Sequence, residues 1–158
     1  MKSISLNSTR LLKKQKVAFK IHQFSDSIHS ADGVAEAVGV APERVYKTLV
    51  ALRQTPRAKP LLVMLSATRT LNLKKVAQAV SEKKVRMASH NEAEKLTGLK
   101  VGGISALALL NKGFDVYIDR AAQKQDTILI SAGKRGVNLE LAVDDLIRIT
   151  NAKWIDAA

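Results

Sequence analysis

The fold is decided by residues 45–67, which read VYKTLVALRQTPRAKPLLVMLSA. The first part, Val45 to Arg53, is rich in β-branched and other apolar residues and predicts a strand. The last part, Leu61 to Ala67, is an apolar run of strand length and predicts a second, buried strand. Pro56 and Pro60 lie between the two parts and indicate a hairpin-type loop. Residues 45–67 therefore predict a β-hairpin with one buried strand.

Towards the N-terminus, the sequence predicts two helices with a strand between them. Apolar residues between positions 6 and 17, separated by basic ones, indicate an amphipathic helix. Residues 18–24 alternate between apolar and polar side chains, which is typical of a strand. Ser30 can then cap a short helix over residues 31–38, and Gly39 can end it.

Towards the C-terminus, helices and strands follow one another without a regular pattern. Asn72 can cap a helix that runs to Val80. Ser89-His90-Asn91-Glu92 forms a capping box, in which the Ser and Glu side chains each satisfy an amide of the first turn, and Gly98 can end that helix. Further strands are expected over 85–88, 114–119, 127–131, 137–141 and 153–155, and a further helix over 144–150.

These elements define the expected fold class. The chain has 158 residues, a usual length for one domain, and contains 46% hydrophobic residues, enough for a substantial core. No repeat, low-complexity stretch or long linker divides it. We therefore expect one α+β domain over residues 1–158, compact, with a mixed and partly barrel-like β-sheet flanked by helices.

Charge and composition narrow the functional classes. Lys and Arg outnumber Asp and Glu by 26 to 14, and a net charge of +12 attracts polyanions, although the same charge could serve solubility alone. The absence of Cys is compatible with a reducing compartment. Residues 1–17 lack the apolar run of a secretory signal, and the run Leu61 to Leu65 is too short to span a bilayer. We expect a cytoplasmic protein without membrane contact.

Several common kinds of reaction centre have no sequence support. His22, His29 and His90 show no metal-ligand spacing, and no H-E-x-x-H motif is present. There is also no G-x-S-x-G elbow, phosphate-binding P-loop or dinucleotide fingerprint. The sequence therefore gives no support for a metal site or for a nucleotide-binding loop.

Three segments carry candidate chemistry, each with a plainer alternative. Lys47 is a cation on a strand and either faces a cleft or points to solvent. Gly102-Gly103-Ile104-Ser105 exposes backbone amides that can stabilise an oxyanion, or it is a tight turn that needs positive φ. Gly133-Lys134-Arg135-Gly136 holds two cations on a glycine turn that can meet phosphates, or it is an ordinary exposed hairpin.

In this order, the segments resemble the YbaK/EbsC family of aminoacyl-tRNA deacylases, which includes the editing domain inserted in bacterial prolyl-tRNA synthetases. The resemblance covers nearly the whole chain, from Leu11 to Trp154, and is greatest to the branch of stand-alone Cys-tRNA(Pro) deacylases. The segments that carry it are 11–19, Val45-Tyr46-Lys47-Thr48-Leu49, Leu71-Asn72-Leu73-Lys74-Lys75, 97–105 and Ser131-Ala132-Gly133-Lys134-Arg135-Gly136.

The resemblance implies a role for particular residues. It makes Lys47 essential for activity, with Gly102 and Gly103 holding the carbonyl of a misacylated tRNA ester during hydrolysis. It also implies that the substrate's own thiol can attack the ester when the amino acid is Cys. Substrate contacts fall on Ile104, Ser105 and Ser131, and tRNA contacts on Lys134 and Arg135. The implied partners are the 3′ acceptor end of tRNA and prolyl-tRNA synthetase, with no metal or other cofactor.

Two departures from the family pattern fall at expected substrate-binding positions. Ala106 stands where the family's glycine loop ends in proline, which would stiffen the loop. Phe24 stands where the family has a tyrosine and lacks its hydroxyl. They leave a trans-editing hydrolase as the main hypothesis, with a non-catalytic member that binds tRNA or a synthetase as the alternative. The preferred amino acid and the oligomeric state stay open.

Overall fold

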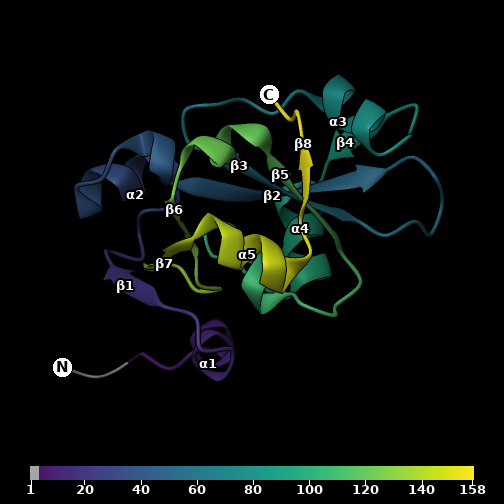
Figure 1. Ribbon diagram of the computed structural model, residues 1–158. Helices are drawn as coiled ribbons and strands as arrows, with labels where there is room; N and C mark the ends of the chain where they lie inside the picture. Colours follow the sequence, from purple (N-terminus) through teal and green to yellow (C-terminus); the bar gives the residue numbers. More distant parts are fainter. Residues whose placement is uncertain (1–3) are drawn as a thin grey trace.

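Two β-sheets form the framework of the computed structural model, which describes residues 4–158 (Figure 1). The smaller sheet has three antiparallel strands in the order β1-β7-β6, with bounds Phe19–Gln23, Val137–Ala142 and Thr127–Ser131. The larger has five strands in the order β4-β2-β3-β5-β8, with bounds Val85–Met87, Tyr46–Arg53, Leu61–Ser66, Asp115–Asp119 and Lys153–Ile155.

The predicted hairpin of residues 45–67 is the centre of the larger sheet. β2 and β3 pair antiparallel, with Lys47 opposite Leu65, and every residue of β3 is buried. β3 pairs with β5, and β5 with β8, in parallel. The sheet is therefore mixed, as the sequence predicted, and its buried strand is the one with the continuous apolar run.

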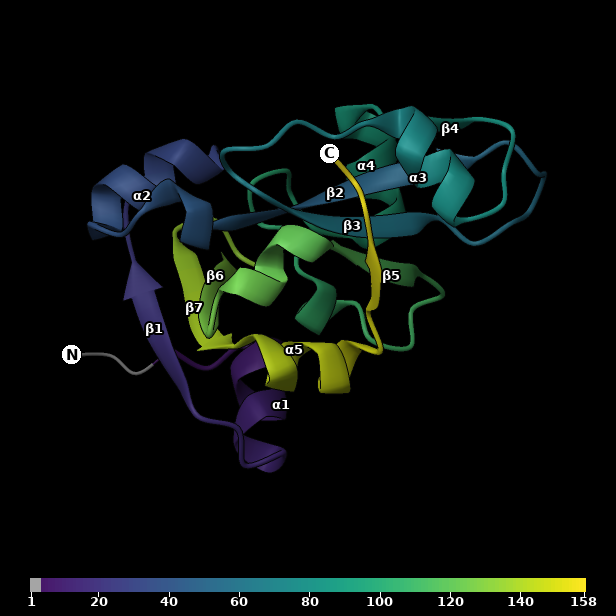
Figure 2. The same cartoon turned by 45° about the horizontal axis from the view of Figure 1, so that its top comes forward.

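The two sheets meet where β2 begins. A single parallel bridge joins Val45 to Leu129 in β6, and the sheets diverge from that point (Figure 2). Within residues 4–158 no barrel closes, so the barrel-like character expected from the sequence is limited to this junction.

Five α-helices and three short 3-10 helices pack on this framework in the described residues. The α-helices are α1 (Asn7–Lys14), α2 (Ala31–Val38), α3 (Leu73–Ala79), α4 (His90–Thr97) and α5 (Val143–Thr150). The 3-10 helices are η1 (Pro42–Arg44), η2 (Ala106–Ala108) and η3 (Arg120–Lys124). The sequence predicted all the α-helices but not the 3-10 helices, because three to five residues are too few to show a hydrophobic period.

The predicted caps explain where α2 and α4 begin and end. The Ser30 hydroxyl accepts a hydrogen bond from the amide of Gly33 at 3.0 Å, and the capping box of Ser89 and Glu92 is complete. Gly39 and Gly98 end the two helices in the left-handed conformation, with φ of 72° and 70°. His29 therefore lies immediately before the N-cap residue Ser30 of α2.

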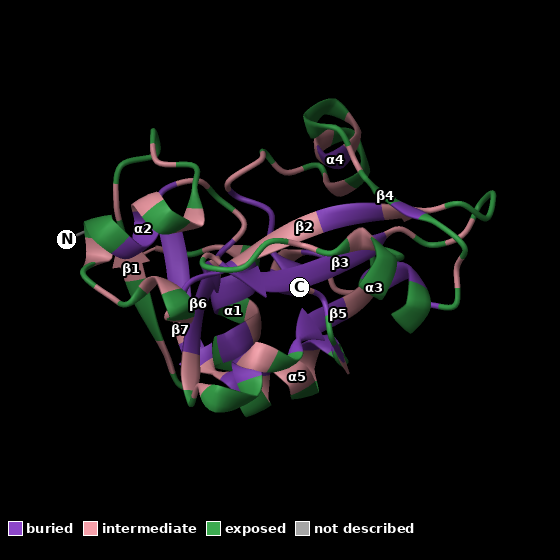
Figure 3. Ribbon diagram, turned by 90° about the horizontal axis from the view of Figure 1, so that it is seen from above, coloured by how far each residue is buried: buried purple, intermediate pink, exposed green. Residues whose placement is uncertain are grey.

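The core fills both faces of the larger sheet. Between the two sheets, α1, α5 and η2 pack on side chains such as Leu62, Met64 and Ile128. On the other face, α3 covers Leu61, Val63 and Leu65. Figure 3 shows β3 buried along its length, while the outer surfaces of α3 and α4 are exposed.

Two further expectations concern the domain boundaries and membrane contact. The expected domain begins at residue 1, but residues 1–3 lie outside the described part of the chain. Among residues 4–158, no helix combines the length and the apolar character that crossing a membrane requires.

Candidate functional site

A pocket of about 290 Å³ borders the first half of β2; we call it the β2 pocket. It exists because β4 pairs only with Ala51 to Arg53 of β2, and within residues 4–158 no other strand pairs with Tyr46 to Val50 on that side. The remaining walls come from the start of α2, the junction of β4 and α4, residues 101–104, and the ends of β6 and β7.

Thr48 presents polar groups at this free edge of β2. Val50 accepts a hydrogen bond from the amide of Ala88, on the β4 side, and Val45 accepts one from Ala67, on the β3 side. Because backbone groups alternate in direction along a strand, the N–H and C=O of Thr48 face away from β3, towards the pocket. The Thr48 hydroxyl is also buried and has no hydrogen-bond partner within residues 4–158.

The glycine loop, residues 101–105, forms the opposite wall, and its glycines allow close packing. Gly102 has φ of +91°, and a Cβ there would lie 3.2 Å from both Cα and Cβ of His29. A Cβ on Gly103 would lie 2.9 Å from the amide nitrogen of Arg135 and 3.1 Å from the carbonyl carbon of Lys134. These contacts are shorter than ordinary van der Waals distances, so a side chain at either position would separate the segments.

The backbone amides of the glycine loop differ in availability. Gly103 donates to the carbonyl of Lys100 at 2.7 Å, and Val101 donates to a carboxylate oxygen of Glu94 at 2.9 Å. In the described part of the chain, the amides of Gly102 and Ile104 have no partner, and both residues line the β2 pocket. Among residues 4–158, the amides of Gly102 and Ile104 are therefore available for a bound group, whereas that of Gly103 is engaged.

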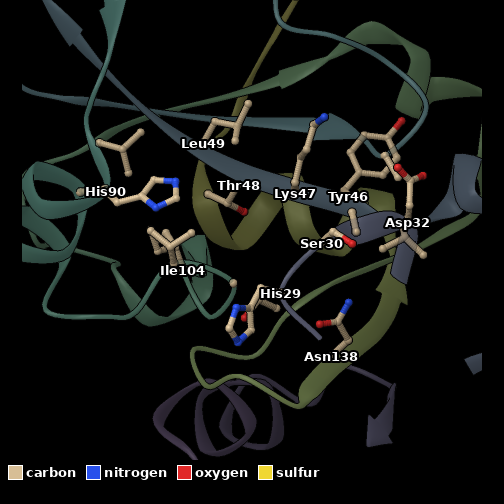
Figure 4. Close-up of a pocket in the computed structure, with 18 of the residues that line it drawn as sticks. His29, Ser30, Asp32, Tyr46, Lys47, Thr48, Leu49, His90, Ile104 and Asn138 are labelled. Atoms are coloured by element: carbon tan, nitrogen blue, oxygen red, sulfur yellow. The ribbon is translucent and has the colours of Figure 1, made fainter. Parts of the chain in front are cut away.

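Lys47 is half-buried and borders the β2 pocket. Successive side chains of a strand point to opposite faces, and Figure 4 shows Lys47 leaving β2 on the side away from Thr48. Its Nζ donates to the carbonyl of Arg69 at 3.0 Å. The structure thus places the Lys47 ammonium at the rim and does not bring it against the glycine loop.

Three predicted substrate-binding residues do not reach the pocket wall. Ser105 is fully buried, and its hydroxyl accepts from the amide of Leu107 at 3.2 Å, which caps η2. Ala106 is 1% exposed and belongs to the core between the sheets. Phe24 packs below α2 against a small apolar cluster. Of the predicted substrate-binding residues, Ser131 and Ile104 do line the pocket.

A second cavity, of about 580 Å³, adjoins the β2 pocket; we call it the basic groove. Lys100, Gly103, Lys134 and Arg135 line it. The Arg135 Nε donates to the carbonyl of Val101 at 2.7 Å, which ties the glycine turn of residues 133–136 to the glycine loop. The two segments that the sequence singled out separately are therefore neighbours.

His29 lines both cavities, and no sequence signal had selected it. Thr48, Ser30, His90 and Asn138 also line the β2 pocket without having been predicted. A histidine before a helix cap is unremarkable in sequence, because only the fold shows that Gly102 lies against it. The sequence predicted that Thr48 lies on a strand, but it did not predict that β4 leaves this part of the strand unpaired.

Ionisable groups shape the surroundings of β2. Burial and the charge of Asp119, only partly offset by Arg69, raise the pKa of Tyr46 to about 12, so its hydroxyl stays protonated at neutral pH. Within residues 4–158, no group of three or more His, Cys, Asp or Glu side chains is arranged to hold a metal ion. The polar groups that line the β2 pocket are hydroxyls, amides, the imidazoles of His29 and His90, the Asp32 carboxylate and the Lys47 ammonium.

Comparison with known proteins identifies the family. The chain matches the model of the aminoacyl-tRNA editing domain over residues 25–149. It is 34% identical over 152 residues to the "Putative Cys-tRNA(Pro)/Cys-tRNA(Cys) deacylase EbsC" of Enterococcus faecalis, covering 95% of this chain and 91% of that protein. It is 26% identical to the uncharacterized protein YwhH of Bacillus subtilis, covering 99% and 95% of the two chains. The chain therefore belongs to the aminoacyl-tRNA editing domain family.

Solved structures with low sequence identity share the fold. The hypothetical protein APE2540 superposes with a TM-score of 0.84 at 20% identity, covering 95% of this chain and 99% of the other. A structure described as "a putative trans-editing enzyme for prolyl tRNA synthetase" superposes with a TM-score of 0.80 at 22% identity, covering 98% of each chain. At these identities the likeness establishes the α+β editing-domain fold and nothing finer.

Proposed function

We propose that this protein is a metal-independent trans-editing hydrolase that cleaves the ester of misacylated tRNA, with Cys-tRNA(Pro) as its main substrate. The observation that carries the proposal is the adjacency of a small pocket and a basic groove, with the glycine loop between them. An aminoacyl-tRNA likewise has two unlike parts, because a small amino acid is joined through its ester to a polyanion. The family membership and the relative from Enterococcus faecalis support this substrate class.

In this proposal the amino acid occupies the β2 pocket. The amides of Gly102 and Ile104 stabilise the carbonyl oxygen as it gains negative charge, and one such donor is worth about 3–4 kcal/mol. Ile104 and Ser131 bound the side chain. In a pocket of about 290 Å³, selection rests on size, and one methylene group changes binding by only about 1–3 kcal/mol.

The basic groove holds the 3′ acceptor end of the tRNA through Lys134 and Arg135. Lys47 adds positive charge at the pocket rim, because its partner among the described residues is a neutral carbonyl. With Cys as the amino acid, the substrate's thiol can itself attack the ester, so no protein nucleophile is required. The net charge of +12 favours encounter with tRNA and with a cytoplasmic complex of tRNA and prolyl-tRNA synthetase.

The test is loss of ester from Cys-tRNA(Pro), Ala-tRNA(Pro) and Ser-tRNA(Pro), each in the presence and absence of a chelator. We expect the fastest loss from Cys-tRNA(Pro) and no effect of the chelator. Lys47→Ala should slow hydrolysis, whereas Lys20→Ala, on the exposed β1, serves as the matched control. No hydrolysis of any substrate above buffer would refute the enzyme hypothesis.

The orientation of Lys47 motivates one alternative function. With its ammonium turned to Arg69, the protein could bind tRNA or a synthetase without turnover. Measurable affinity for Cys-tRNA(Pro) together with no ester loss would favour this alternative. Hydrolysis that depends on Lys47 would exclude it.

A further inference from the structure

His29 lies at the boundary between the β2 pocket and the basic groove. It lines both cavities, and its Cα and Cβ lie 3.2 Å from where a Cβ of Gly102 would be. Figure 4 shows His29, His90 and Ile104 around the space that Thr48 faces. If the amino acid fills the pocket and the ribose and phosphate enter the groove, the ester crosses between them beside His29.

A hydrogen bond sets the tautomer of the His29 ring. Its Nε2 lies 3.0 Å from the carbonyl oxygen of Asp26. A carbonyl oxygen only accepts, so Nε2 is the donor, and in the neutral ring Nδ1 carries the lone pair. A backbone contact of this kind fixes the tautomer of the ring and leaves the other nitrogen as an acceptor, which a general base requires.

We propose that His29 is a catalytic residue, the general base of the hydrolysis; this inference rests on the proposed function. Nδ1 accepts a proton as a water oxygen bonds to the ester carbonyl carbon. The carbonyl oxygen becomes an oxyanion at the amides of Gly102 and Ile104. The bond between that carbon and the ribose oxygen then breaks, and Nδ1–H returns its proton to the ribose oxygen. The products are the free amino acid and a tRNA with its hydroxyl restored.

Other groups near the ester are less suited to this step. Lys47 lies across β2 with its Nζ on Arg69, and Asp32 is exposed in the first turn of α2, at the helix end that favours a carboxylate's negative charge. His90 faces the same pocket but does not line the groove. The charged groups around His29 are Asp26, Asp32, Lys100, Lys134, Arg135 and, across the pocket, His90. Three of these groups are lysine or arginine and two are carboxylates, so the balance is cationic, which suits an anionic substrate.

The experiment measures kcat and KM for Ala-tRNA(Pro), which has no thiol of its own, against pH. His29→Gln is the central variant, because a Gln amide can still donate to Asp26 but has no basic nitrogen in place of Nδ1. We expect kcat to fall by about 100-fold or more, the usual contribution of a general base, with KM changed less than about threefold. The loss of kcat that the parent protein shows on the acid side should disappear in this variant.

The controls separate catalysis from structure. His22→Gln, in β1 and outside both cavities, should retain the parent's rate and pH profile. His29→Ala should regain part of its rate when imidazole is added, a rescue that a purely structural role would not give.

An active parent whose pH profile persists in His29→Gln overturns the proposal. So does a profile that disappears in His90→Gln but not in His29→Gln. An inactive parent refutes the proposed function itself, and this inference with it.

Discussion

Replacement of Gly103 by alanine tests whether the glycine loop and the turn at residues 133–136 must touch. Gly103 is not among the residues with positive φ, so its own backbone conformation does not require glycine. The added Cβ would lie 2.9 Å from the amide nitrogen of Arg135 and 3.1 Å from the carbonyl carbon of Lys134. Ordinary carbon contacts begin at about 3.5 Å. The two segments must therefore move apart by roughly 0.5 Å.

The cost follows from what that movement disturbs. Overpacking of a well-packed contact costs about 1–3 kcal/mol, and here the neighbours are backbone atoms that cannot rotate aside. For a chain of this size, about 2–4 °C of Tm is lost per kcal/mol, which gives a decrease on the order of 2–12 °C. The 2.7 Å bond from Arg135 to Val101 spans the same contact, so hydrolysis should fall as well.

The assays are thermal unfolding and ester loss, with Gly113→Ala as the matched control. Gly113 has φ of +87° and no atom within 4 Å of an added Cβ, so this variant adds backbone strain of about 1–2 kcal/mol without any clash. It should lose some stability and keep its activity. A Gly103→Ala protein that melts and hydrolyses like the parent would refute the reasoning.

Three further predictions follow from single contacts. Lys134→Ala should weaken tRNA binding and reduce the slope of log K against log salt by about 0.7–0.9, one phosphate contact. Burial of Glu140 opposes ionisation, but hydrogen bonds from His22, Thr127 and Arg44 outweigh it and lower its pKa. A carboxylate whose pKa is lowered in the folded state stabilises that state, and this contribution is lost as pH falls through the lowered pKa. In unfolding measurements below about pH 4.3, Glu140→Gln should therefore weaken the dependence of the free energy of unfolding on pH. Ala106→Pro should raise stability by about 0.4–1 kcal/mol, since Ser105 is extended, with φ of −136°; a lower Tm would show that the buried ring does not fit.

The sequence predicted the fold well because its signals were local. The apolar run that begins at Leu61 predicts a buried strand whichever strands lie beside it, and β3 is buried throughout. The caps at Ser30 and Ser89 bond to amides only three residues away. The sheet order is not local. β3 takes β5 as its parallel neighbour across the whole of α3 and α4, and no residue pattern in the hairpin specifies that choice.

The candidate site was predicted less completely, for a related reason. Alternation along β2 predicts that Lys47 and Thr48 face opposite ways, but not which of them faces the glycine loop. The close approach of Gly102 to His29 joins residues far apart in sequence. Sequence motifs had identified the glycine loop and the turn at residues 133–136 as separate features. Only their packing shows that both line the basic groove.

The missing family proline at Ala106 has a structural counterpart that bears on function. Proline would stiffen the loop by fixing φ; here the loop is held by contacts at several points. The Gly103 amide binds Lys100, the Ser105 hydroxyl caps η2, and Arg135 binds Val101 at 2.7 Å. Since these bonds flank Gly102 and Ile104, the two free amides are held in place without the ring. Ala106 itself belongs to the core between the sheets and does not line the β2 pocket, so it would not contact a bound amino acid directly.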